Sequence, residues 1–312
     1  MEADTKLHDV IMIGAGPSAL AAAVYTTRED IDTILLEKGV IGGLAAITDW
    51  VDNYPGFPQG VEGIKLAELL QGQAERFGAV IQFGEVTKIE DKGDYKLVET
   101  TEGPLKAKTV LISTGSDYKK LGIPGEAEYY GRGVHYCATC DGAFYRDKTL
   151  VVVGGGNSAI QEAIFLTRFT SHIDLLVRST IKASEVLQRE LEEYVENGKI
   201  TVHLNTTTDE IVAQDDTTFI VKGQTDGKPA EFKTDGIFVF IGLLPNTGFL
   251  KDSGIELDEV GLIKTDENLQ TSIKGVFASG DVRSGATMQI ASAVGEGATA
   301  ALKIREYLEG RL

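Results

Sequence analysis

Two cysteines, Cys137 and Cys140, are the only thiols in the sequence, and they stand two residues apart in CATCDG. Thiols at this spacing can close a disulfide because one turn of helix brings the sulfurs together, and a helix N-terminus stabilises a thiolate. A thiolate is the species that attacks a disulfide, so the pair is typical of catalytic or redox-sensing dithiol chemistry. A purely structural disulfide is not expected in a cytosolic chain, whose surroundings keep ordinary thiols reduced.

A zinc site is an alternative interpretation of the cysteine pair. Zinc sites usually need four protein ligands, and the chain offers no third cysteine. The remaining ligands would have to come from the four histidines, which are His8, His135, His172 and His203. These could supply only a sparse mixed set, so we expect no metal site.

Length and charge limit the kind of protein that carries this pair. At 312 residues the chain exceeds the size at which a single hydrophobic core usually stops growing, so two domains are expected. The formal charge of −17 argues against nucleic acid or an anionic membrane as partner, because both attract basic surfaces. The N-terminal residues lack the basic start and long apolar core of a signal peptide. We therefore expect a cytoplasmic protein.

The N-terminal segment contains a dinucleotide-binding pattern. It predicts a buried strand over His8–Ile13, a glycine turn and an alanine-rich helix. Gly14, Gly16 and Ala19 fit G-x-G-x-x-G/A, and a second strand ends at the acidic Glu37. Such a turn lets the backbone approach a pyrophosphate at the positive end of the helix. The carboxylate stands where ribose hydroxyls would donate hydrogen bonds to it.

The same pattern occurs a second time, close behind the cysteines. A strand over Leu150–Val153 is followed by Gly154, Gly156 and Ala159, and then by a second helical segment. Each glycine turn can cradle one pyrophosphate, so two turns predict two bound dinucleotides. A duplicated second turn that binds nothing is the alternative.

Each half of the chain also carries hairpin material that leads into a buried strand, expected over Thr109–Ser113 and over Gly236–Gly242. This repeat predicts an α/β fold in which each half is a dinucleotide-binding sheet with a small β insertion. Towards the C-terminus, Gly280 and Asp281 follow another strand, a position where an acid commonly faces a ligand. An aspartate that only caps a helix or closes a turn is the alternative.

With these segments placed, the chain resembles low-molecular-weight thioredoxin reductases over essentially its whole length. The matching stretches include GAGPSALAAAVYTTR, STGSDYKKLGIPGE, GRGVHYCATCDGAFYRDK, GGGNSAIQEA, DGIFVFIGLLPNT and GVFASGDVR. The resemblance implies two Rossmann-like, three-layer ββα domains in a homodimeric protein. Residues 1–117 and 246–312 would form a discontinuous FAD-binding domain, and residues 118–245 an NAD(P)H-binding domain that carries the disulfide. The central domain would rotate on connections near Ser116–Lys119 and Pro245–Gly248.

The resemblance also implies an electron path and the residues along it. NADPH would reduce FAD, the flavin would reduce the Cys137–Cys140 disulfide, and the dithiol would reduce thioredoxin or a thioredoxin-like protein, with Asp141 as the acid that supplies or removes the proton. The implied FAD residues are Gly14, Gly16, Pro17, Ser18, Ala19, Glu37, Lys38, Gly43, Leu44, Asn53, Thr114, Gly115, Gly280, Asp281, Met288, Gln289 and Ile290. The implied NADPH residues are Gly154, Gly156, Asn157, Ser158, Ala159, Arg178 and Lys182.

Three positions depart from the pattern of the NADPH-dependent members. Leu44 stands where they have a glutamine, and Met288 where they have an arginine before Gln289. The arginine cluster that grips the 2′-phosphate of NADPH is reduced to Arg178 and Lys182. NADH, or ferredoxin or another donor, is therefore the alternative to NADPH. The alternative to an enzyme is a flavoprotein that senses redox state without catalysis.

Overall fold

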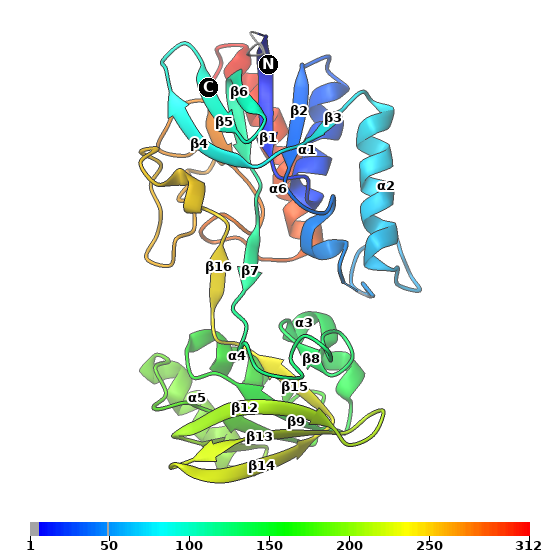
Figure 1. Ribbon diagram of the computed structural model, residues 1–312, viewed down its shortest axis with the longest axis vertical. Helices are drawn as coiled ribbons and strands as arrows, with labels where there is room; N and C mark the ends of the chain where they lie inside the picture. Colours follow the sequence, from blue (N-terminus) through cyan, green and yellow to red (C-terminus); the bar gives the residue numbers. More distant parts are fainter. Residues whose placement is uncertain (1–5, 49) are drawn as a thin grey trace. The chain divides into compact units, whose positions relative to one another are not determined.

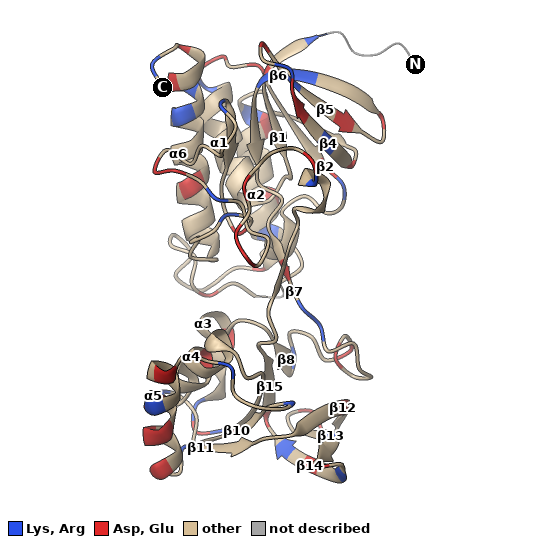
Figure 2. Cartoon of the chain, turned by 90° about the vertical axis from the view of Figure 1, so that its left-hand side faces the viewer, with Lys and Arg blue, Asp and Glu red and all other residues tan. Residues whose placement is uncertain are grey.

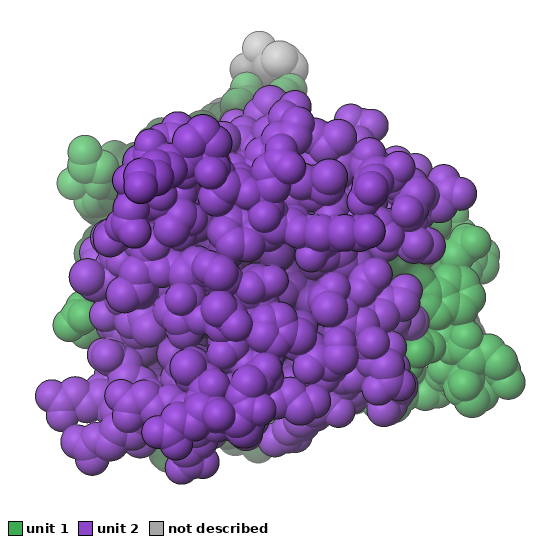
Figure 3. All heavy atoms as spheres, turned by 90° about the horizontal axis from the view of Figure 1, so that it is seen from below, with its two compact units in different colours: residues 1–117, 244–312 green, residues 118–243 purple. Residues whose placement is uncertain are grey.

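The computed structural model describes residues 6–48 and 50–312 of the chain. The chain divides into two compact units, which we call unit 1 (Met1–Asp117 with Leu244–Leu312) and unit 2 (Tyr118–Leu243), coloured separately in Figure 3. It passes from one unit to the other twice, in strands β7 (Ser116–Tyr118) and β16 (Leu243–Pro245). These two strands pair with each other as a two-stranded sheet (Figure 1).

Unit 1 is built on a seven-stranded sheet in the order β3-β2-β1-β6-β5-β4, with β17 also pairing with β6. Strands β3, β2, β1, β6 and β17 run parallel, whereas β4 and β5 form an antiparallel meander with β6. The elements are β1 (Leu7–Ile13), α1 (Pro17–Thr27), β2 (Thr33–Glu37), η1 (Gly43–Ala45), α2 (Gly63–Arg76), β3 (Val80–Phe83), β4 (Val86–Asp91), β5 (Lys96–Thr100), β6 (Gly103–Ile112), η3 (Gly248–Leu250), β17 (Val276–Ala278) and α6 (Ile290–Leu308).

The central strands of unit 1 are buried on both faces, which explains their unbroken apolar sequences. Successive side chains of a strand point to opposite faces, so Val10 and Met12 of β1 pack with helices α1 and α6. Ile11 and Ile13 pack on the other face, against the meander and the segment after η3. Unit 1 therefore has three layers, and its parallel strands end together at one edge of the sheet.

A glycine sets the distance between the two long helices of unit 1. A Cβ at Gly297 of α6 would lie 2.0 Å from the carbonyl oxygen of Ser18 in α1. No larger residue fits at that position, and the two helices can therefore pack backbone to backbone. This contact joins the start of the chain to its last helix.

Unit 2 contains a five-stranded parallel sheet in the order β11-β10-β9-β15-β8 and a separate three-stranded antiparallel sheet, β12-β13-β14. Its elements are β8 (Val134–His135), α3 (Ala138–Asp141), η2 (Gly142–Tyr145), β9 (Thr149–Val153), α4 (Asn157–Leu166), β10 (His172–Leu176), α5 (Glu185–Glu196), β11 (Ile200–His203), β12 (Thr206–Ala213), β13 (Phe219–Thr225), β14 (Lys228–Thr234) and β15 (Gly236–Val239).

The parallel sheet of unit 2 is also covered on both faces. Leu150 and Val152 of β9 pack with the helices, and Val151 and Val153 pack against the three-stranded sheet. Charged side chains lie on the outer surfaces, as the acidic face of α5 shows (Figure 2). Within the described ranges, no helix combines the length and apolar character needed to cross a bilayer.

The α/β class with two parallel sheets is confirmed, but two expected strands have different ends. The strand expected over Gly236–Gly242 stops at Val239, because its neighbour β9 ends at Val153 and the ladder has no further partner. The strand expected over Thr109–Ser113 begins much earlier, at Gly103. Its first half is more exposed than its second, since it pairs with β5 at the border of the meander.

Candidate functional site

The first glycine turn connects β1 to α1 and has the shape of a phosphate cradle. Gly14 has a φ of +97°, and a Cβ on it would lie 2.5 Å from the carbonyl oxygen of Ser113. A Cβ on Gly16 would meet nothing within 4 Å, so the backbone is open to a ligand there. Among the described residues, no side chain caps α1, whose first residue is Pro17. The first amide groups of the helix are available to bind an anion.

A cavity of about 360 Å³ opens at this turn, and all of its walls belong to unit 1. Its lining includes every residue expected to contact FAD except Ala19, which is buried beneath the turn, and Asn53 and Met288. Further residues, most of them close in sequence to the expected ones, also contribute to the wall. These additional lining residues are Gly39, Val40, Ala45, Ile47, Ser113, Ser116, Asp117, Asn246, Ser279 and Ala293.

Glu37 is held at the end of β2 by two backbone amides. Its Oε2 accepts from the amide of Ala15 at 2.8 Å, and its Oε1 accepts from the amide of Gly39 at 2.7 Å. These contacts orient the carboxylate at the cavity wall, and each oxygen retains a lone pair for a further donor. Lys38 beside it pairs with Glu85 at 3.4 Å.

Asp281 also lines the cavity, directly after the left-handed Gly280. Burial, assisted by the negative charge of Glu296, raises the pKa of Asp281 to about 6. The amide of Gly280 donates to Glu296 Oε2 at 2.8 Å, and Arg283 pairs with the same carboxylate. Ser116 Oγ donates to the carbonyl oxygen of Asp281 at 2.5 Å, which fixes the peptide. The site thus presents a carboxyl group poised between protonated and ionised forms near neutral pH.

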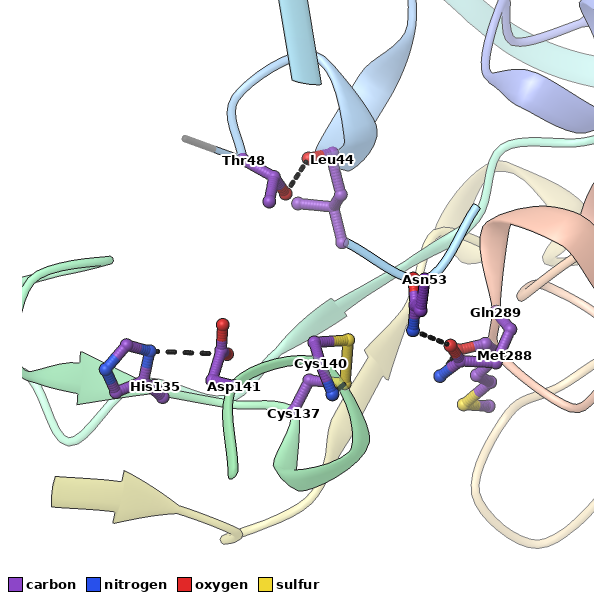
Figure 4. Close-up of a disulfide and its surroundings, with 9 residues drawn as sticks. All are labelled: Leu44, Thr48, Asn53, His135, Cys137, Cys140, Asp141, Met288 and Gln289. Carbon is purple, nitrogen blue, oxygen red and sulfur yellow. Dashed lines mark hydrogen bonds and ion pairs between the residues drawn. A yellow bond between two sulfur atoms is a disulfide. The ribbon is translucent and has the colours of Figure 1, made fainter. Parts of the chain in front are cut away.

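Two of the positions that depart from the family pattern, Leu44 and Met288, lie in unit 1. Leu44 lies in η1, and its carbonyl oxygen accepts from Thr48 at 2.8 Å (Figure 4). Asn53 Nδ2 donates to Gln289 Oε1 at 3.1 Å, so these two side chains orient each other (Figure 4). Met288 has a φ of +55°, an uncommon value for a residue with a side chain, and Gln289 follows it at the start of α6.

The second glycine turn, in unit 2, repeats the geometry of the first. Gly154 packs closely on the carbonyl oxygen of Phe240 and on the Cβ of Ala159, whereas a Cβ on Gly156 would meet nothing within 4 Å. Helix α4 begins directly afterwards and, within the described part of the chain, has no side-chain cap. The turn therefore offers a second open backbone site for a phosphate.

The loop after β10 is tied to this second turn. The amide of Lys182 donates to the carbonyl oxygen of Gly155 at 2.7 Å, and the amide of Ser184 donates to Asn157 Oδ1 at 2.8 Å. Arg178, Lys182 and Ser158 are exposed. The loop that carries both expected basic residues is thus bonded to the glycine turn at Lys182, and the Asn157 side chain anchors the loop.

Cys137 and Cys140 form a disulfide in unit 2, with their Cα atoms 5.3 Å apart. Cys137 caps the single turn of α3, its Sγ accepting from the amide of Cys140 at 3.2 Å. Both cysteines are half-buried. Asp141 ends the turn, and its carboxyl points toward His135 (Figure 4), with Oδ2 3.2 Å from the ring Nδ1. His135 entered the sequence analysis only as a possible zinc ligand, because no local pattern links it to Asp141.

The comparisons with known proteins agree with this arrangement. A family model described as pyridine nucleotide-disulphide oxidoreductase matches residues 8–297. A protein named thioredoxin reductase from Bacillus subtilis (strain 168) is 40% identical over 309 residues, which cover 98% of this chain and 96% of the relative. The crystal structure of a thioredoxin reductase from Streptococcus pyogenes MGAS5005 shares 39% identity, with 97% and 99% of the two chains covered and a TM-score of 0.90. A thioredoxin reductase from Giardia duodenalis shares 30% identity, with 98% and 100% covered and a TM-score of 0.91.

Proposed function

This chain belongs to the pyridine nucleotide-disulphide oxidoreductase family, and from that premise we propose that it is a thioredoxin reductase. In this proposal it carries electrons from NADPH through FAD and the Cys137–Cys140 disulfide to thioredoxin, and it acts as a homodimer. The cysteine pair is the observation that supports the proposal most strongly. The two cysteines form a disulfide in unit 2, which also contains the second glycine turn. The first glycine turn lines the cavity of unit 1.

The residues of unit 1 fit an FAD molecule. A Cβ at Gly16 would project into open space, as expected where a pyrophosphate approaches the backbone. Glu37, whose oxygens keep free lone pairs, would accept hydrogen bonds from the adenosine ribose, and Asp281 would contact the same cofactor. Gln289 and Leu44 would line the remaining part of the site. Bound FAD would supply the two-electron chemistry that links a nicotinamide nucleotide to a disulfide.

The residues of unit 2 fit a nicotinamide dinucleotide at the second glycine turn. Gly156 leaves the backbone open there, and the first turn of α4 would bind the pyrophosphate. Arg178 and Lys182 are the basic side chains of the adjoining loop, and they would pair with a 2′-phosphate. We therefore place NADPH first as donor and keep NADH as the alternative.

Within unit 2, the cysteines and Asp141 would perform the exchange with thioredoxin. One cysteine attacks the partner disulfide as a thiolate, and the second cysteine then displaces the reduced partner. Asp141 directly follows the pair and would accept the thiol proton before the attack and return it to the leaving sulfur. After the disulfide has been reduced, Asp141 would also give a proton to one of the two cysteine sulfurs, so that they do not both remain thiolates.

Cysteine variants of the purified yellow protein test the proposal. Cys137→Ser and Cys140→Ser should each retain FAD and lose essentially all NADPH-dependent reduction of thioredoxin, because neither variant can close the disulfide. Electron transfer from NADPH to a small dye that accepts electrons directly from flavin should continue in both. Wild-type protein that binds FAD but reduces no thioredoxin with NADPH or NADH would refute the proposal and favour a redox sensor.

A further inference from the structure

Three side chains of unit 2 form a chain of polar contacts that starts beside the disulfide: an ion-pair contact joins Asp141 to His135, and a hydrogen bond joins His135 to Tyr145. His135 Nδ1 lies 3.2 Å from Asp141 Oδ2, and His135 Nε2 lies 2.6 Å from the hydroxyl of Tyr145. His135 is only 5% exposed. Every polar atom of this imidazole therefore contacts a partner that can exchange a proton with it.

The imidazole is fixed in orientation by its surroundings. It stacks on Phe238 of β15 with 5.1 Å between the ring centroids, and Tyr145 meets the same phenylalanine edge-on. A Cβ at Gly236 would lie 2.4 Å from the Tyr145 ring, so only glycine leaves room for this tyrosine. Because the ring is packed in this way, Nδ1 stays directed at Asp141 and Nε2 at Tyr145.

The chain can hold an additional proton without leaving any buried donor unpaired. Burial, with smaller contributions from Asp141 and Asp235, raises the pKa of Tyr145 far above its ordinary value, so the phenol stays neutral. An ionised Asp141 only accepts, so Nδ1 carries the hydrogen and the neutral ring accepts the Tyr145 hydroxyl at Nε2. When the ring takes a second proton at Nε2, the phenol oxygen becomes the acceptor.

The other end of the chain adjoins the cysteines. The amide of Asp141 donates to the carbonyl oxygen of Cys137 at 3.2 Å, which is the hydrogen bond of a complete helical turn. Cys137 is the N-cap of α3 and Asp141 is its last residue, so this one turn holds the backbone of the acid next to the cysteine pair. Nearby charges are those of Asp235, before β15, and Lys148, whose Nζ lies 5.9 Å from the Tyr145 ring centroid.

We propose that His135 is a positioning residue for Asp141 and that the two side chains act as one proton-carrying pair during thiol–disulfide exchange. This inference rests on the proposed function and concerns the same site. A cysteine thiol gives its proton to the pair, the thiolate attacks the partner disulfide, and the released partner sulfur takes up the proton. The second cysteine then gives its proton to the pair and attacks the first cysteine's sulfur in the mixed disulfide, and the second partner sulfur leaves and takes up that proton. One partner S–S bond and two enzyme S–H bonds break, while the Cys137–Cys140 bond and two partner S–H bonds form, and two electrons pass to the partner.

Two substitutions of His135 test its contact with Asp141 separately from its contact with Tyr145. His135→Asn keeps a donor near the position of Nδ1, and His135→Gln keeps one near Nε2, but neither can take a second proton. In the FAD-loaded protein reduced with dithiothreitol, the rate of cysteine alkylation by iodoacetamide is followed from about pH 5.5 to about pH 9.5. We expect the midpoint to rise by roughly one pH unit in both variants, towards the value of about 8.5 of an unassisted thiol.

The same variants are assayed for kcat/KM with thioredoxin over the same pH range. Near neutral pH we expect a loss of about tenfold, which shrinks on the alkaline side because the thiolate then forms without help. Tyr145→Phe should shift the alkylation midpoint upward by a smaller amount, since a protonated ring would lose its acceptor. His172→Gln is the matched control, because His172 lies in the same unit and bonds to the carbonyl oxygen of Gly198.

Several results would overturn the inference. If the midpoint stays at the wild-type value in both His135 variants and in Tyr145→Phe, His135 has no part in the proton transfer. If only His135→Asn keeps the wild-type alkylation midpoint, a hydrogen-bond donor that orients Asp141 is enough, and the pair carries no proton. A loss of kcat/KM that is equal at every pH indicates a structural role. Alkylation needs neither donor nor thioredoxin, so its outcome is independent of whether the proposed function holds.

Discussion

Thr114 and Asn246 exchange two hydrogen bonds although they lie 132 positions apart in the chain. Thr114 Oγ1 donates to the carbonyl oxygen of Asn246 at 2.8 Å, and Asn246 Nδ2 donates to the carbonyl oxygen of Thr114 at 3.1 Å. A third bond joins the amide of Asn246 to the carbonyl oxygen of Gly115 at 3.1 Å. The segments leading out of unit 1 and back into it are therefore tied together inside that unit.

Asn246→Ala should destabilise unit 1, because it leaves the Thr114 carbonyl without its side-chain donor. Net contributions of about 1 kcal/mol per hydrogen bond predict a loss of roughly 1–2 kcal/mol in the free energy of unfolding. Thr114→Val, which removes the other side-chain bond, should cost a similar amount. Chemical denaturation of both single variants and the double variant measures the coupling, and strictly additive losses would mean that the two bonds act independently.

The pH dependence of stability should reveal the state of Asp281. Its pKa is raised to about 6 in the folded protein, against 3.8 when exposed. The folded state therefore binds this proton more tightly, and the stabilisation is complete below about pH 4 and lost as pH rises through about 6. In protein stripped of flavin, the wild type should lose up to about 3 kcal/mol relative to Asp281→Asn across that window. Parallel curves for the two proteins would contradict this expectation.

Gly16→Ala should separate flavin binding from folding. The φ of Gly16 is −77°, which alanine also adopts, and the new Cβ would enter only the open cavity. We expect a folded protein with little or no bound FAD, measured as the ratio of flavin to protein absorbance. Gly72→Ala is the matched control, because Gly72 is exposed in the middle of α2 with nothing within 4 Å of its Cβ. That change should keep FAD and leave the protein equally or more stable.

Arg178→Ala should discriminate between the two nicotinamide donors. If Arg178 pairs with a 2′-phosphate, the KM for NADPH should rise by about tenfold, while the KM for NADH should change little. Arg189→Ala provides the control, since Arg189 is an exposed arginine of α5 in the same unit that pairs with Glu185. Equal effects of Arg178→Ala on both nucleotides would show that the residue does not read the phosphate.

The sequence indicated the parts of the site whose geometry is local. The glycine turns at Gly14 and Gly154 each lie within one strand–turn–helix unit, and their residue spacing alone determines how they fold. The sequence did not indicate that Asn246 and Ser279 line the cavity. Both residues follow unit 2 in the chain, so only the tertiary fold brings them to the first glycine turn.

The contacts of His135 also lay beyond sequence reasoning. The residue stands two positions before Cys137, in a strand of only two residues, and no periodicity tells which way its ring points. Its direction depends on Phe238, which joins the sheet about a hundred residues later. Histidine, aspartate and tyrosine at this spacing carry no recognised pattern, so only packing shows that they form one chain.

The discontinuity of unit 1 has a consequence for biosynthesis. A ribosome delivers the whole of unit 2 before it delivers β17 and α6. Until then the end of β6 pairs with β1 on one side but lacks β17 on the other, and the apolar face of α1 lacks the helix that approaches it at Gly297. During synthesis of unit 2, the first segment of unit 1 therefore keeps a strand edge and an apolar helix face uncovered. Such uncovered surface is prone to aggregation during folding, and the complete flavin cavity exists only once the start of α6 has been made.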